Sequence, residues 1–89
     1  MSETNSYQTL AAEIIQKQTV ILGPGIAISQ ARNVEGLTVS DDGSVTNIAE
    51  GREQEIVQSL INEYVSLSGL IVKKAMEPLL SKYPSLKID

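Results

Sequence analysis

The sequence contains neither cysteine nor histidine. Without cysteine there are no disulfides, no thiolate nucleophiles and no thiolate ligands for zinc or iron–sulfur clusters. Without histidine the chain lacks the side chain that most often transfers protons near neutral pH and binds transition metals. Among the remaining polar residues, no pair is placed as acid–base or nucleophilic catalysis requires. We therefore expect no enzymatic activity, no cofactor and no metal.

Aromatic residues and positive charge are also scarce. The 89 residues include three tyrosines and no Trp or Phe, and the net charge is −4. The core should therefore be aliphatic, and neither base stacking nor attraction to phosphate or an anionic membrane is favoured. Residues 1–7 do not have the pattern of a secretory signal, and no apolar run reaches the roughly 18 residues of a membrane span. We expect a soluble, cytoplasmic protein that binds neither nucleic acid nor membranes.

A kinked pair of helices is expected in the first third of the chain. After Ser6, which suits an N-cap, apolar residues recur at helical spacing as far as Leu22. Proline lacks an N–H and collides with the carbonyl four residues earlier, but it is well tolerated in the first turn of a helix. A second, short helix is therefore expected to end near Asn33. The residues assigned to a structural corner between the two helices are Gly23, Pro24 and Gly25.

The same corner invites comparison with a phosphate-binding loop, in which backbone amides face an anion at a helix N-terminus. A dinucleotide-binding fingerprint needs a third glycine where this chain has Ile28, and the lysine and Ser/Thr of a Walker loop are missing. A helix–helix corner is the favoured interpretation.

Residues 36–48 change to an alternating pattern typical of strands. Leu37 and Val39 precede Asp41-Asp42-Gly43, after which the alternation resumes, so a short β-hairpin is predicted. The acidic turn does not have the ligand spacing of a calcium-binding EF-hand loop. We interpret it as a turn exposed to solvent, and the glutamates that follow it as a solvated charged face.

The most extended pattern is an amphipathic helix predicted to run to about residue 80. Asn47 and Glu50 have capping-box spacing near its start, and apolar residues at steps of three and four continue from Val57 to Leu79. A break at Gly69 or Pro78 is left open. The small residues Ser66, Ser68 and Gly69 would allow close approach of another backbone, either from the same chain or from a second copy.

These elements predict a mainly helical α+β fold, with a disordered segment 1–5, a single small domain 6–84 and a tail 85–89. A long apolar stripe needs a partner surface of similar length, so we expect a protein-interaction, adaptor or small regulatory module that self-associates, with a dimer favoured. The alternative is a small-ligand-binding domain with an aliphatic pocket beside the glycine-containing corner. The candidate interface residues are Leu60, Tyr64, Leu67 and Ile71.

Overall fold

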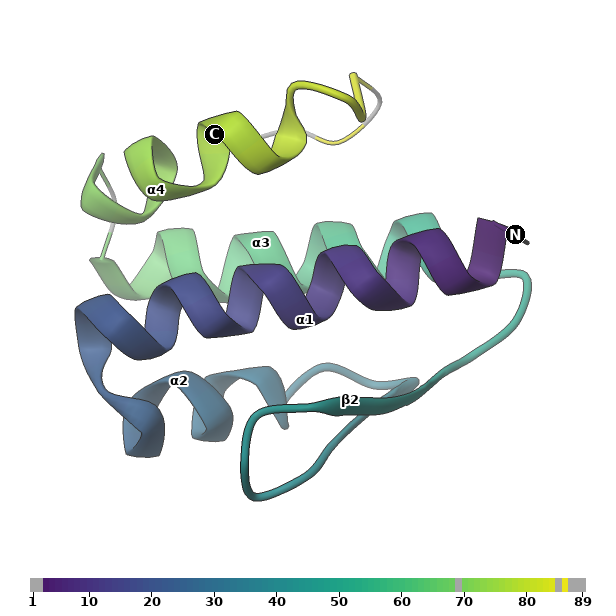
Figure 1. The fold of residues 1–89 in the computed structure, drawn as a ribbon, viewed down its shortest axis with the longest axis horizontal. Coiled ribbons are helices and arrows are strands. Elements are labelled where there is room, and N and C mark those ends of the chain that lie inside the picture. The colour runs from purple at the N-terminus through teal and green to yellow at the C-terminus, as the bar shows by residue number, and fades with distance from the viewer. Residues whose placement is uncertain (1–2, 69, 85, 87–89) are drawn as a thin grey trace.

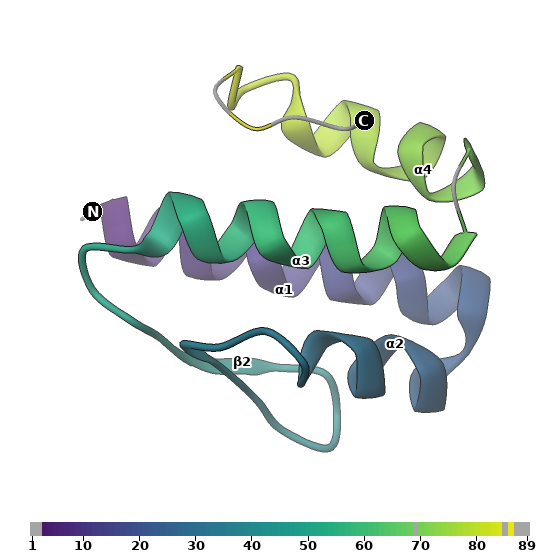
Figure 2. The ribbon, with the colours of Figure 1, turned by 180° about the vertical axis from the view of Figure 1, so that it is seen from behind.

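Four helices and one hairpin make up the described part of the chain. The computed structural model describes residues 3–68, 70–84 and 86, without the side chains of 3–5, 68, 70–73 and 75. Helices α1 and α3 lie side by side in a middle layer, with α2 and the hairpin on one side and α4 on the other (Figures 1 and 2). This is the mainly helical α+β fold that the sequence predicts. The elements are α1 (Glu3–Leu22), α2 (Pro24–Ala31), β1 (Leu37–Val39), β2 (Val45–Ile48), α3 (Glu53–Ser68) and α4 (Leu70–Leu80).

The junction of α1 and α2 is a reversal of chain direction. Gly23, between the helices, has φ 88° and ψ 153°, a conformation that is accessible essentially to glycine alone. It directs α2 back along α1, and the two helices pack against each other (Figure 1). The prediction of a kinked helix pair was therefore wrong, because one glycine turns the chain completely. Helix α1 also begins at Glu3, three residues before the predicted Ser6 cap.

The predicted long C-terminal helix is two shorter helices. Helix α3 ends at Ser68, and α4 begins at Leu70 and folds back across α1 and α3 (Figure 1). Gly69, where a break was left open, lies outside the described residues. Pro78 is inside α4, which continues to Leu80. Folding back buries Met76 and Leu80, whose apolar surface would stay in water if the helix continued straight.

The start of α3 also differs from the prediction. Asn47 lies in β2 and Glu50 in the turn that follows it, so the expected capping box does not form. Gly51, with φ 84°, completes this turn. The carbonyl of Arg52 then accepts the first helical hydrogen bond, from the N–H of Ile56 at 2.9 Å.

The β-hairpin has the predicted position. Its strands are antiparallel, with Leu37 opposite Ile48 and Val39 opposite Val45. A bulge leaves one extra residue, Thr46, in β2, and this shift places Val45 and Ile48 on the same buried face. The apolar face of the hairpin packs on α1 and α2, which supplies the cover that an isolated hairpin lacks.

The core is aliphatic apart from one aromatic ring and one thioether. Tyr64 is fully buried, and its hydroxyl donates a hydrogen bond to the carbonyl of Ala27 at 2.6 Å, which joins α3 to α2. Beyond α4, the ring of Tyr83 lies 5.7 Å from that of Tyr7. This contact holds the chain after α4 against the beginning of α1. Each element contributes buried side chains, for example Ile14, Ala27, Val39, Ile48, Leu60 and Met76.

Candidate functional site

The four candidate interface residues do not form one exposed surface. Leu60 and Tyr64 are fully buried within the single chain. Leu67 lies near the end of α3 and is 44% exposed. Ile71 lies in the first turn of α4, and its side chain is outside the described residues. The part of the stripe carried by α3 is therefore covered mainly by other elements of the same chain.

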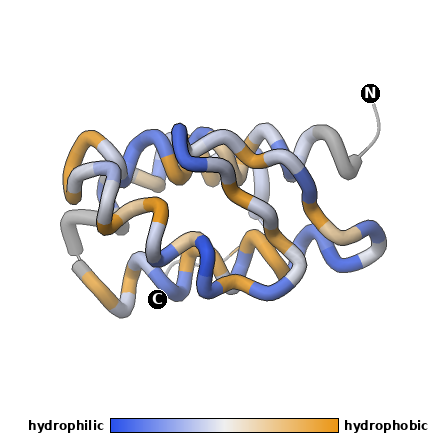
Figure 3. Tube along the Cα trace, turned by 90° about the horizontal axis from the view of Figure 1, so that it is seen from below, coloured by the Kyte–Doolittle hydropathy of each residue, from blue (hydrophilic) through white to orange (hydrophobic). Residues whose placement is uncertain are grey.

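A different apolar surface lies at the end of the molecule where both helix reversals occur. Helices α1 and α3 end there and α2 and α4 begin there (Figure 1), and Figure 3 shows apolar segments of α1, α2 and α3 at this end. We call it the corner surface. Its members, the large apolar residues that are exposed in the described part of the chain, are Val20 (86% exposed), Ile26 (50%), Leu67 (44%) and Ile21 (39%).

Three of these residues, Val20, Ile21 and Ile26, are not among the interface residues predicted from the sequence. Val20 follows the buried residue Gln18 by two positions, and this spacing places it on the side of α1 that points away from the core. The run Val20-Ile21-Leu22 is thus too wide for a single buried stripe. This run was the sequence signal for an exposed apolar side chain, because three consecutive apolar residues on one helix cannot all face the same core.

The corner residues Gly23, Pro24 and Gly25 have different roles in the backbone. Gly23 provides the reversal, and Pro24 occupies the first turn of α2, where its missing N–H has no helical partner to lose. Gly25 is different, since its φ is not positive and no atom lies within 4 Å of the point where a Cβ would be. Nothing in the described structure requires glycine at that position.

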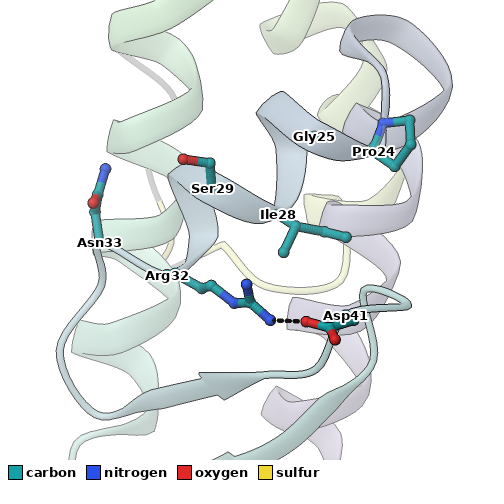
Figure 4. Close-up of a pocket in the computed structure, with 7 residues that line it drawn as sticks. All are labelled: Pro24, Gly25, Ile28, Ser29, Arg32, Asn33 and Asp41. Atoms are coloured by element: carbon teal, nitrogen blue, oxygen red, sulfur yellow. Dashed lines mark hydrogen bonds and ion pairs between the residues drawn. The ribbon is translucent and has the colours of Figure 1, made fainter.

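A shallow hollow of about 470 Å³ runs along α2 from Pro24 and Gly25 to Arg32 (Figure 4). The Nε and Nη2 atoms of Arg32 both donate to the carbonyl of Val39 at 3.2 Å, and Nη2 also meets Asp41 Oδ1 at 2.7 Å. The guanidinium therefore fastens the end of α2 to the hairpin. The side chain of Arg32 is about half exposed, so its ion pair with Asp41 contributes little to stability by itself.

The acidic turn of the hairpin is held by its own serines. The hydroxyl of Ser40 donates to Asp42 Oδ1 at 2.7 Å, and the N–H of Ser44 donates to the same oxygen at 2.9 Å. These hydrogen bonds, first that of Ser40 and then those of Ser44, lower the pKa of Asp42 to about 2. The carboxylate stabilises the turn, as Asp in such turns commonly does.

The described part of the chain has few other groups that could bind a ligand or a metal ion. There, no three acidic side chains lie close enough together to hold a metal ion. The described helices include none that is long and apolar enough to cross a membrane. Burial raises the pKa of the Tyr64 hydroxyl, which keeps it protonated and unreactive at neutral pH.

Apart from Tyr64 with its hydroxyl, Gln18 is the one fully buried side chain with polar atoms among the described residues. Within the part of the chain that the structure describes, neither its amide nitrogen nor its amide oxygen has a hydrogen-bond partner. It lies four residues after Ile14 and seven after Ala11, so it points to the same face of α1 as they do. The amide faces the core and does not line the hollow along α2.

No family model, curated protein or solved structure matches this chain. The corner surface and the hollow along α2 are therefore the two candidate sites.

Proposed function

We propose that this chain is a small, non-enzymatic protein-interaction module of the cytoplasm that contacts its partner through the corner surface. The observation that carries the proposal is the grouping of Val20, Ile21, Ile26 and Leu67 at one end, while the other large apolar side chains that the structure describes are buried or partly buried. At these exposed fractions, the four side chains leave on the order of 400 Å² of apolar surface, a size that often marks an interaction site.

Self-association is one form of this proposal. The dimer predicted from the stripe would use Leu60 and Tyr64, which are buried and would have to leave the core first. A dimer compatible with the fold uses the corner surface instead. Sedimentation equilibrium tests it, because mass action raises the dimer fraction with protein concentration. Loss of a concentration-dependent dimer in a double variant, Val20→Ser and Ile26→Ser, would support contact at this surface.

The interaction proposal is tested most directly by selecting binders from a displayed library of random peptides. We expect selected peptides to bind the wild-type chain and to lose binding to the Val20→Ser, Ile26→Ser double variant. Thr9→Ser is the matched control, because Thr9 is exposed at the opposite end of α1. The double variant should unfold close to the wild-type midpoint, since Val20 is 86% exposed and Ile26 is half exposed. Peptides that bind wild type and double variant equally would contradict the proposal.

A small ligand in the hollow along α2 is the second candidate. The observation in its favour is the combination of Pro24 and Ile28 with the polar Ser29 and Arg32 around one concavity (Figure 4). Thermal melting with pools of metabolites tests this function, because a ligand specific to the folded state raises the melting temperature. Gly25→Met would project a side chain toward this hollow and should abolish the shift without disturbing the core.

A further inference from the structure

The residues of the two hairpin strands give little protection against pairing with a further strand. Segments 37–39 and 45–48 are rich in Val, Ile and Thr, and they contain neither proline nor a charged residue. The exposed edges of such strands are templates for another strand, and natural proteins often place charges or proline there to prevent this pairing. Protection by side chains must therefore come from other elements of the fold.

The hydrogen bonds of the hairpin show which backbone groups point away from it. The N–H of Ser40 donates to the carbonyl of Ser44 at 2.9 Å, and Val39 and Val45 are the next pair along the ladder. In an antiparallel pair, positions bonded across the ladder alternate with positions whose N–H and C=O point outward. The carbonyls of Val39 and Val45 therefore face outward, one from each edge of the sheet.

A side chain from a neighbouring helix already occupies each of these two carbonyls. Gln8 of α1 donates from Nε2 to the carbonyl of Val45 at 2.9 Å. The side chain of Arg32 extends from the end of α2 towards the hairpin (Figure 4), and its Nε and Nη2 donate to the carbonyl of Val39 at 3.2 Å. Because Val39 and Val45 lie opposite each other, α1 and α2 close the same pair of residues from its two sides.

We propose that Gln8 and Arg32 are edge guards, which keep the hairpin of one copy from pairing edge to edge with the hairpin of a second copy. Alternation turns only Leu37 and Val39 of β1 outward, so occupation of Val39 removes half of the positions that a third strand could bind. A second copy fits an unguarded edge, because identical short strands of high β propensity pair readily with each other. The guarded edges are separate from the corner surface, so this device does not depend on the proposed function.

The test removes one guard at a time, so that each variant examines its own edge. Gln8→Met and Arg32→Met keep the aliphatic length of the side chain and have similar helix propensity, but they remove the donors. Sedimentation equilibrium of the full chain over a range of concentration gives the dimerisation constant. In a symmetric dimer both copies lose the same guard, so each variant should dimerise at least about tenfold more strongly than the wild-type chain.

NMR spectra of the isotopically labelled variants locate the contact. Removal of the Gln8 amide opens the edge of β2, so we expect concentration-dependent amide shifts at residues 45–48. Removal of the Arg32 guanidinium opens the edge of β1, and the shifts are expected at residues 37–39. Hydrogen bonds that only held the hairpin in place would instead change the signals of both strands equally at every concentration.

Gln16→Met and Lys82→Met are the matched controls. Gln16 is exposed on α1 and Lys82 is exposed beyond α4, and Lys82→Met removes the same charge as Arg32→Met. Both controls should associate no more than the wild-type chain. Met76→Ala controls for lost stability, because it removes a buried side chain of α4. It should unfold more easily without concentration-dependent shifts in the hairpin.

Three results would overturn the edge guards. If the variants dimerise no more strongly than their controls, the short length of the strands closes the edges and the side chains do not. Equal concentration-dependent shifts of the hairpin in wild type and variants would show that the guards do not hinder pairing. Association with shifts at residues 20–26, and none in the hairpin, would assign self-association to the corner surface instead.

Discussion

At the scale of single residues, Tyr64 shows how a polar group is accommodated in an aliphatic core. Its ring is fully buried, and its hydroxyl reaches the carbonyl of Ala27 at 2.6 Å. Burial raises the pKa of this hydroxyl above its ordinary value of about 10. The folded state therefore favours the protonated phenol, and the unfolded state ionises first as pH rises.

Tyr64→Phe should cost about 1 to 2 kcal/mol of unfolding free energy at pH 7, because it removes a buried hydrogen bond. The sign of the pH dependence follows from the raised pKa. The contribution of Tyr64 is complete below pH 10 and is lost as pH rises above that value toward the folded-state pKa. Urea unfolding at pH 7 and at pH 11 checks both points. A difference between wild type and variant that does not narrow at pH 11 would contradict this account.

Gln18 is the opposite case, a buried amide without partners among the described residues. Gln18→Met keeps the length of the side chain and removes the unsatisfied polar atoms, so it should raise the unfolding free energy by about 1 to 2 kcal/mol. Gln16→Met is the matched control, because Gln16 is exposed on the same helix and its replacement should change stability very little. Denaturant unfolding of the two variants decides the point. If Gln18→Met is destabilising, the amide has a partner that satisfies it.

At the scale of elements, three glycines allow the cost of an unfavourable backbone conformation to be distinguished from the cost of steric crowding. Gly36 and Gly51 both have positive φ, but only at Gly36 would a Cβ collide, at 2.7 Å from Ile56 Cδ1. Gly25 has neither constraint. Each glycine therefore makes a different prediction for the same substitution.

Replacement by alanine should rank these three positions. Gly51→Ala should lose about 1 to 2 kcal/mol of stability from backbone strain alone. Gly36→Ala should lose about 1 to 3 kcal/mol more, because the buried side chain of Ile56 must also shift to make room for the methyl group. Gly25→Ala should gain up to about 1 kcal/mol, since alanine favours the helix. Melting temperatures of the three variants provide the ranking. Equal losses of stability for Gly36→Ala and Gly51→Ala would contradict the predicted steric crowding at position 36.

The sequence predicts those parts of the fold that depend on neighbouring residues, such as turns and helix ends. The hairpin around Asp41-Asp42-Gly43 and the end of α1 at Gly23 follow from turn residues and from the proline at position 24. The division of the stripe into α3 and α4 does not follow from such residues, because the apolar residues of segment 57–79 keep helical spacing on both sides of the break. What decides that break is the burial of Met76 and Leu80 when α4 packs on α1 and α3, which involves distant parts of the chain.

The candidate surface was predictable only in part. Helical spacing puts Leu67 on the stripe, but its exposure depends on where α3 ends. Leu60 and Tyr64 were assigned to an interface because a stripe on a straight helix needs an external partner. Once the chain folds back, the same stripe is covered from within. The corner surface exists because two helix reversals occur at the same end, which periodicity along one helix does not encode.

At the scale of the whole molecule, stability depends on α4 covering the α1–α3 layer. Met76 is the largest α4 side chain described as fully buried. Met76→Ala should lower the unfolding free energy by about 2 to 5 kcal/mol, through lost burial and the cavity that remains. Lys74→Ala, on the exposed side of the same helix, should change it by less than about 0.5 kcal/mol. Urea unfolding of both variants measures the contrast, and equal effects would show that α4 does not pack as described.

The central claim is that the chain covers its own apolar stripe by folding α4 back. Because the sequence has no cysteine, Thr9→Cys and Lys82→Cys introduce two unique sites for spin labels at exposed positions. The most direct test is the distance between these labels by pulsed electron resonance, in dilute protein mixed with excess unlabelled chain. The contact between Tyr7 and Tyr83 predicts a separation below about 20 Å. A straight helix from residue 53 to 80 would extend about 40 Å and carry residue 82 to the far end, so a separation near that length would contradict the account.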